Sequence, residues 1–107
     1  MLKRKIHDVR LSSRASGDLV DIAEYISHSE SDASARRVTS RILRVVQSLK
    51  RRAFMWRERE GLFKEARIVL AHPYAILYRV DGSVVMVVRI AHGRRDVEAL
   101  FLDDRDI

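Results

Sequence analysis

The chain has no cysteine and only one proline in 107 residues. Without thiols it can form no disulfide and offers no thiolate to a metal or a substrate, as is usual for proteins of reducing compartments. No apolar run approaches the roughly 20 residues needed to span a bilayer. The basic residues 3–5 are not followed by the apolar stretch of a secretory signal. These absences predict a cytoplasmic protein that does not enter a membrane.

Signs of a metal or cofactor site are also missing from the sequence. The histidines have no metal-ligand spacing, either among themselves or with acidic residues. The glycines are isolated, so no glycine-rich loop is available to hold a phosphate. The sequence therefore predicts no metal and no cofactor, and His7 and His28 are expected to face solvent or to cap a helix.

What the chain does have is positive charge. It carries 21 Lys and Arg against 15 Asp and Glu, a net charge of +6, and arginine predominates over lysine. Such a surplus favours polyanionic partners: nucleic acid, an acidic protein segment, or a protein that itself handles nucleic acid. A basic surface without a dedicated role explains the composition about equally well.

The first half of the chain predicts a strand and two helices. Residues 4–11 predict a strand with Ile6, Val9 and Leu11 as its apolar members. Residues 14–28 place apolar side chains at helical spacing after a capping Ser12 or Ser13. Asp18 is expected in the first turn of this helix, on its solvated face. A second helix follows the capping Ser31. Residues 53–61 are irregular, with Trp56 as a core anchor.

The second half predicts three strands, over residues 62–70, 74–80 and 83–91. The dipeptide Asp81-Gly82 between the last two favours a hairpin with a type I′ turn. The predicted architecture is one α+β domain over residues 1–107, with the order β-α-α-β-β-β and an antiparallel sheet that packs a helical hairpin on one face. Because both faces of the later strands are apolar, the other face needs cover from the tail and from a partner.

Two groups of basic side chains are candidate binding sites. One lies at the end of the last strand, where Arg89, His92, Arg94 and Arg95 could bind an anion or pair with the acidic tail. The other is a stripe of arginines along the second helix: Arg37, Arg41 and Arg44. This stripe could bind an acidic partner or nucleic acid, or form an ordinary exposed face.

The order and spacing of several short motifs resemble the ParE/RelE superfamily of bacterial toxins. The N-terminal part of the resemblance is carried by Ala15-x-x-Asp18-Leu19-x-x-Ile22-Ala23-x-Tyr25-Ile26. The C-terminal part is carried by Tyr74-x-x-x-Tyr78-Arg79-Val80 and Val87-Val88-Arg89-Ile90-Ala91-His92-Gly93-Arg94-Arg95-Asp96. The resemblance implies a growth-inhibiting, plasmid-stabilising toxin whose cognate antitoxin is encoded alongside it and wraps it with a C-terminal segment.

The two branches of the superfamily imply different functions. RelE-like toxins cut messenger RNA on the ribosome without a metal, but the positions of their catalytic side chains hold Ala66, Ile68, Ala75 and Phe101 here. Of that set only Arg95 is kept. An alternative catalytic site would have to use Arg67, Arg79, His92 and Arg95.

The His92-Gly93-Arg94-Arg95-Asp96 ending is typical of ParE-like toxins, which poison DNA gyrase and carry no catalytic residues. The resemblance therefore implies a gyrase-binding toxin with a ParD-like antitoxin. The target contacts are expected at Arg89, His92, Arg94 and Arg95, and the antitoxin contacts at Arg37, Arg41, Arg44, Tyr74 and Tyr78. A RelE-type ribonuclease remains the second hypothesis, and a plain RNA-binding domain the third.

Overall fold

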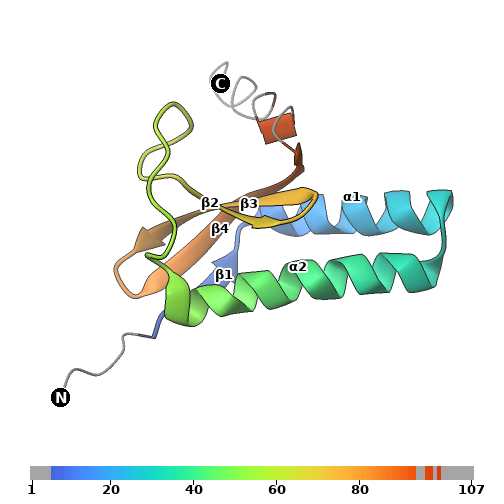
Figure 1. Ribbon diagram of the computed structural model, residues 1–107, viewed down its shortest axis with the longest axis horizontal. Helices are drawn as coiled ribbons and strands as arrows, with labels where there is room; N and C mark the ends of the chain where they lie inside the picture. Colours follow the sequence, from blue (N-terminus) through green and yellow to red (C-terminus); the bar gives the residue numbers. More distant parts are fainter. Residues whose placement is uncertain (1–5, 94–95, 98, 100–107) are drawn as a thin grey trace.

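The computed structural model describes residues 6–93, 96, 97 and 99. Two helices and four strands follow one another as β1 (Asp8–Leu11), α1 (Ser13–Ser29), α2 (Asp32–Arg52), β2 (Arg67–Ala71), β3 (Tyr74–Asp81) and β4 (Val84–His92). The helices form a hairpin that lies against one side of the sheet (Figure 1). The predicted α+β class and element order are confirmed. No helix within these residues is both long and apolar enough to cross a membrane.

Serine caps fix the start of each helix. The Ser12 Oγ accepts a hydrogen bond from the Ala15 N–H at 3.0 Å, and the Ser31 Oγ accepts one from the Ser34 N–H at 3.0 Å. Each bond satisfies an amide that has no partner inside its helix. Ser12 rather than Ser13 therefore caps α1, and the prediction for Ser31 is confirmed.

The sheet is mixed, with the strand order β1-β4-β3-β2. β2, β3 and β4 pair antiparallel, as their tight connections predict, but β1 pairs parallel with β4. The expectation of an antiparallel sheet is thus corrected at its first strand. The order of elements predicts direction only where a short turn joins two strands, whereas the helical hairpin carries the chain away from β1 and back to the opposite edge of the sheet.

The expected strand over residues 62–70 begins later than predicted. Residues 62–66 form turns, in which the Ala66 N–H donates to the Phe63 carbonyl at 3.1 Å, and β2 starts at Arg67. Gly61 and Glu65 both have positive φ, at 85° and 60°, which is incompatible with an extended strand. The apolar residues before Arg67 therefore lie in a packed loop.

The hairpin between β3 and β4 is confirmed, but its turn differs from the prediction. Asp81 pairs with Val84, so the central residues are Gly82 and Ser83. Gly82 has φ +59°, whereas Ser83 is not among the positive-φ residues. A positive φ at the first central position alone indicates a type II′ turn, which requires glycine there.

Apolar side chains pack on both faces of the sheet. The larger cluster lies between the helices and the sheet, with Ile42, Val46, Leu49, Ile76 and Tyr78 at its centre and Trp56 packed against it. A smaller cluster is formed by alternate residues of the strands, by the loop before β2 and by Val97 after β4: Ala75, Leu77, Ala91, Val97, Leu62, Phe63 and Ile68. Because neighbouring strand residues point to opposite faces, this cluster lies on the face away from the helices, called here the outer face.

Candidate functional surfaces

Arg89, a predicted target contact, is bound within the fold. Its Nε and Nη2 donate to the two carboxylate oxygens of Asp18 at 2.9 Å each, and the two side chains are 16% and 14% exposed. Asp18 also accepts a hydrogen bond from the Ile90 N–H at 2.9 Å. Asp18 is the sixth residue of α1, so the predictions of a first-turn position and a solvated role were wrong.

This ion pair closes an open stretch of sheet edge. β1 ends where Leu11 faces Val87, so beyond this point β4 has a neighbouring strand, β3, on one side only. Ser12 covers the next part of that edge, since its N–H donates to the Val87 carbonyl at 2.9 Å and its Oγ to the Val88 carbonyl at 2.7 Å. Further along the same edge, the Asp18 carboxylate accepts the hydrogen bond of the Ile90 N–H. The first turns of α1 thus protect an edge that would otherwise be free to pair with another chain.

His92 ends β4 and is exposed, beside the start of β3. Its ring meets the Tyr74 ring edge to face, with 5.2 Å between centroids. Gly93 follows with φ +74° and donates its N–H to the Pro73 carbonyl at 2.9 Å, which turns the chain away from the sheet. Arg94 and Arg95 lie outside the described residues. His92 therefore remains available as a surface contact at this end of the sheet.

Both tyrosines expected to contact an antitoxin are core residues. Tyr78 is 0% exposed and its hydroxyl donates to the Ala53 carbonyl at 2.8 Å; burial raises its pKa to about 12. Tyr74 is 7% exposed, and burial raises its pKa too, against an opposing effect of the nearby Arg41. Their side chains are thus withdrawn from the surface, which corrects their placement at an antitoxin interface.

The residues of the alternative catalytic site do not converge. Arg67 lies over the Phe54 ring at 5.2 Å and donates to the Trp56 carbonyl. Arg79 pairs with Asp81 at 2.8 Å near the hairpin turn. His92 pairs with Tyr74 at the opposite end of β3. Tyr74 is five residues from Arg79, which corresponds to about 17 Å along the strand. The distances and partners give no proton-transfer pair among these three, and Arg95 lies outside the described residues.

Of the four positions that the resemblance aligns with catalytic side chains of RelE-like toxins, the three described ones are apolar and packed. Ile68 and Ala75 belong to the small cluster on the outer face, and Ala66 is fully buried. Phe101 lies outside the described residues. None of the three described side chains can donate or accept a proton.

His7 behaves differently from the sequence prediction. It is 3% exposed, stacks edge to face on Phe54 with 5.5 Å between centroids, and neither ring nitrogen has a hydrogen-bond partner. The expected solvent-facing role was wrong for His7. His28 does lie in the last turn of α1, where its Nδ1 contacts the Glu24 carbonyl at 2.9 Å, as a capping role requires.

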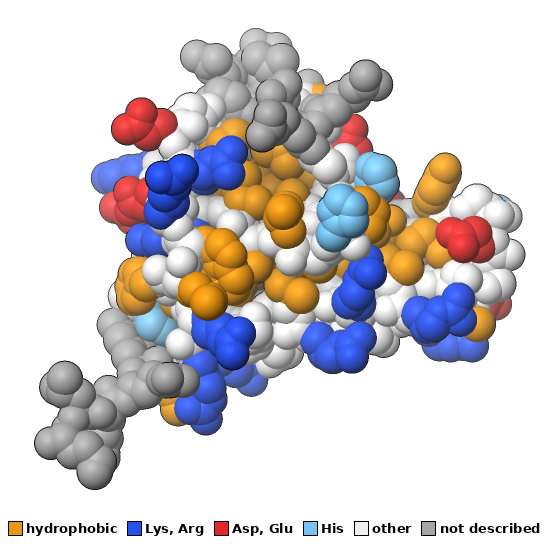
Figure 2. Space-filling model, viewed as in Figure 1, with side chains coloured by type: hydrophobic (Ala, Val, Ile, Leu, Met, Phe, Trp, Pro, Cys, Tyr) orange, Lys and Arg blue, Asp and Glu red, His pale blue; other side chains and the backbone are white. Residues whose placement is uncertain are grey.

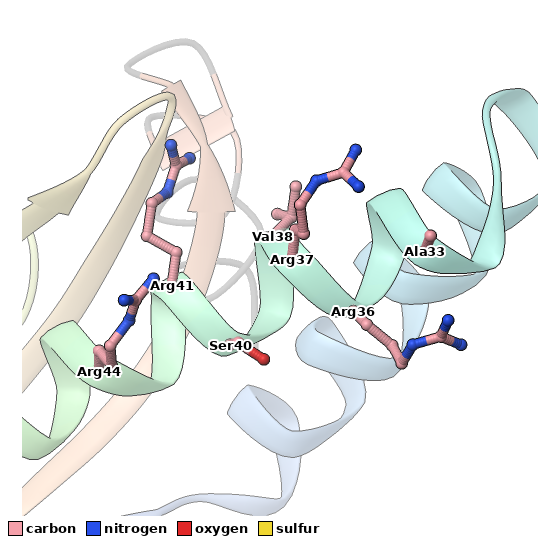
Figure 3. Close-up of a pocket in the computed structure, with 7 residues that line it drawn as sticks. All are labelled: Ala33, Arg36, Arg37, Val38, Ser40, Arg41 and Arg44. Carbon is pink, nitrogen blue, oxygen red and sulfur yellow. The ribbon is translucent and has the colours of Figure 1, made fainter.

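The arginines of α2 line a shallow, open hollow on the surface. Figure 3 shows Arg37, Arg41 and Arg44 extending to the same side of the helix, with Arg36 directed away from them. The hollow is completed by small or short side chains: Ala33, Val38 and Ser40. Arg37 donates to the Ser34 Oγ at 2.9 Å and Arg41 to the His72 carbonyl. We call Arg37, Arg41, Arg44 and Arg51 the arginine face, because Arg51 lies two turns beyond Arg44.

The positive charge of the protein is concentrated on this helix. α2 carries seven Lys and Arg side chains and one acidic residue, so its net charge of +6 equals that of the whole chain. Basic side chains run along the lower border of the molecule, over α2 (Figure 2). The rest of the chain is therefore neutral in sum. A stripe with this charge can attract a polyanion over the length of the helix.

A four-stranded mixed sheet backed by a helical hairpin is the fold of chains in solved toxin–antitoxin systems. The fold matches "Chromosomal ParDE TA system from P. aeruginosa" with a TM-score of 0.75 and 18% identity, over 84% of this chain and 99% of that chain. It also matches a toxin–antitoxin complex, RelBE2 from Mycobacterium tuberculosis, with a TM-score of 0.64 and 18% identity, over 81% and 98% of the two chains.

The sequence makes the assignment more specific. Residues 9–97 match the family described as "ParE toxin of type II toxin-antitoxin system, parDE". The chain therefore belongs to the ParE toxin family, and the predicted ParE/RelE resemblance is confirmed. No curated protein matches the chain.

Proposed function

We propose that this toxin acts by binding and inhibiting DNA gyrase, not by cleaving RNA. The observation that carries the proposal is the dispersal of the three candidate acids or bases that the structure describes. Arg67, Arg79 and His92 lie apart, and Ile68 and Ala75 occupy an apolar cluster where a metal-independent ribonuclease needs proton-transfer groups. A protein that works by binding needs complementary surfaces and no such constellation.

The target surface in this proposal is the end of β4, where His92 is exposed and Arg94 and Arg95 follow in the sequence. The Asp18–Arg89 pair holds this end by tying β4 to α1. Arg89 thereby acts as a positioning residue rather than a contact. This proposal revises the expected set of target contacts to His92, Arg94 and Arg95.

A ParD-like antitoxin is the proposed partner that neutralises the toxin. Arg37, Arg41 and Arg44 are exposed and suit acidic residues of such a segment. Leu70, which is 63% exposed on the outer face, adds an apolar contact. The proposed function thus needs two surfaces, one for the target and one for the antitoxin.

Two assays with the purified chain test the proposal. We expect loss of gyrase supercoiling of a relaxed plasmid, and no cleavage of messenger RNA in a reconstituted translation reaction. Messenger RNA cleavage with unaffected supercoiling would overturn the proposal in favour of a RelE-type ribonuclease. A heat-denatured sample of the same preparation serves as the control in both assays.

A further inference from the structure

We propose that the arginine face of α2 binds the phosphate backbone of duplex DNA, independently of base sequence. This goes beyond inhibition of gyrase and neutralisation by an antitoxin, since it concerns the free toxin and DNA alone. It rests on where the fold places its charge, because α2 carries a net charge equal to that of the entire chain.

No described carboxylate neutralises the cations of the arginine face. Elsewhere the described structure pairs arginines with carboxylates: Arg67 with Glu58, Arg79 with Asp81 and Arg89 with Asp18. Within the described residues, no carboxylate pairs with a basic side chain of α2. The contacts of Arg37 and Arg41 are to uncharged oxygens and use one of the five N–H donors of a guanidinium, which leaves the charge and the other donors for a ligand.

The shape of the face fits a long, regular polyanion. α2 has 21 residues and is therefore about 31 Å long, which corresponds to roughly nine base pairs of duplex at 3.4 Å each. Arg37, Arg44 and Arg51 recur every seven residues, so they stay on one side of the helix. Guanidinium groups also match phosphate oxygens in a bidentate geometry that lysine does not offer.

The face suits a nucleic acid better than a folded peptide helix. An amphipathic helix binds through apolar anchors at the centre of its contact, but the hollow on α2 contains only Ala33 and Val38 as apolar residues. The most exposed large apolar side chains lie on other elements, such as Tyr25 and Leu70. An acidic antitoxin segment that contacts these arginines would compete with DNA, and this adds a second effect to neutralisation.

The test measures binding of the purified chain to a fluorescent 20-base-pair duplex of arbitrary sequence, by anisotropy over a series of salt concentrations. Four phosphate contacts predict a slope of log K against log salt of about −3 to −4. The variant R37Q/R44Q is expected to weaken binding roughly 10²-fold at about 50 mM salt and to make the slope shallower by about 2. Glutamine has a helix propensity similar to that of arginine, so the fold is retained, as circular dichroism will verify.

The matched control is R57Q/R59Q, which removes the same charge from exposed arginines outside α2. A change of less than about threefold in this control supports the proposal, because charges at a distance are screened by salt. Equal losses in the two variants would mean that only net charge matters, and would overturn it.

A 20-residue polyglutamate peptide provides the other comparison. If it binds through Arg37 and Arg44 while the duplex does not bind, the face is an acidic-peptide surface and the proposal is wrong. Gyrase inhibition by R37Q/R44Q is measured separately. Loss of DNA binding with inhibition retained leaves the proposed function intact, so the two proposals fail independently.

Discussion

Breaking the ion pair between Asp18 and Arg89 should destabilise the fold more than any exposed charge change. The two side chains are only 14% and 16% exposed and share two hydrogen bonds of 2.9 Å, and Asp18 accepts a third from Ile90. Removing one partner of a buried pair costs about 3–5 kcal/mol, because the other charge is left buried without compensation. For Asp18→Ala we expect about 3 kcal/mol, at the lower end since the site retains some exposure.

Urea unfolding followed by circular dichroism measures this loss, and a double-mutant cycle apportions it. Arg89→Met removes the charge and keeps most of the packing, so the combined variant D18A/R89M should cost at least about 1.5 kcal/mol less than the sum of the two single changes. Asp18→Asn is the matched control, because it keeps an acceptor for the Ile90 N–H and loses only the charge.

The reasoning would be refuted if Asp18→Ala changed the free energy of unfolding by less than about 0.5 kcal/mol, as an exposed pair would. It would equally be refuted if the effects of the two substitutions were additive. Either result would mean that water already screens the pair. It would also mean that the edge of β4 beyond Val87, where β1 ends, does not depend on α1 for its cover.

Three further predictions concern single side chains. His92→Gln should leave gyrase inhibition largely intact, whereas a ribonuclease that used His92 as acid or base would lose about 10²–10⁴-fold in rate of RNA cleavage. Since the pKa of Tyr78 is raised to about 12 from an ordinary value near 10, the unfolded chain loses this proton first as pH rises. Stability should therefore fall by roughly 2–3 kcal/mol between about pH 10 and pH 12. In Tyr78→Phe, pH-dependent unfolding should show this alkaline loss reduced, and the lost hydrogen bond to Ala53 should cost about 1 kcal/mol at pH 7. His7→Leu should raise the unfolding free energy by about 1 kcal/mol in urea titrations, because it removes two buried nitrogens without partners; a lower value would indicate that the ring is satisfied in solution.

The elements of this fold can be predicted from sequence because their signals are local. Helix caps at Ser12 and Ser31 and the hairpin around Gly82 each depend on a few neighbouring residues. The parallel pairing of β1 with β4 joins segments about 75 residues apart, for which no local pattern exists. The apolar loop before β2 resembled a strand because packing against the outer face selects the same residue types as a strand does.

The candidate sites were harder to predict for the same physical reason. Arg89 and Asp18 are 71 residues apart in sequence, so nothing local distinguishes a bound arginine from a free one. Tyr74 and Tyr78 carry a polar tip on a large apolar ring, and sequence alone does not decide whether such a residue is buried. The arginines of α2 were identified correctly as an exposed stripe because a helical period alone fixes which side chains share a face.

The structure separates the positions that maintain the fold from those available for binding. Asp18 and Arg89 connect α1 to β4, and their loss should be seen first in stability. The arginine face has no carboxylate partner among the described residues, so its substitution should change binding while stability stays within about 0.5 kcal/mol. His92 is exposed at the far end of β4 and also lies outside the core. A substitution at each of these three places therefore tests fold, polyanion binding and target binding one at a time, and effects that fail to separate in this way would show that the surfaces act together.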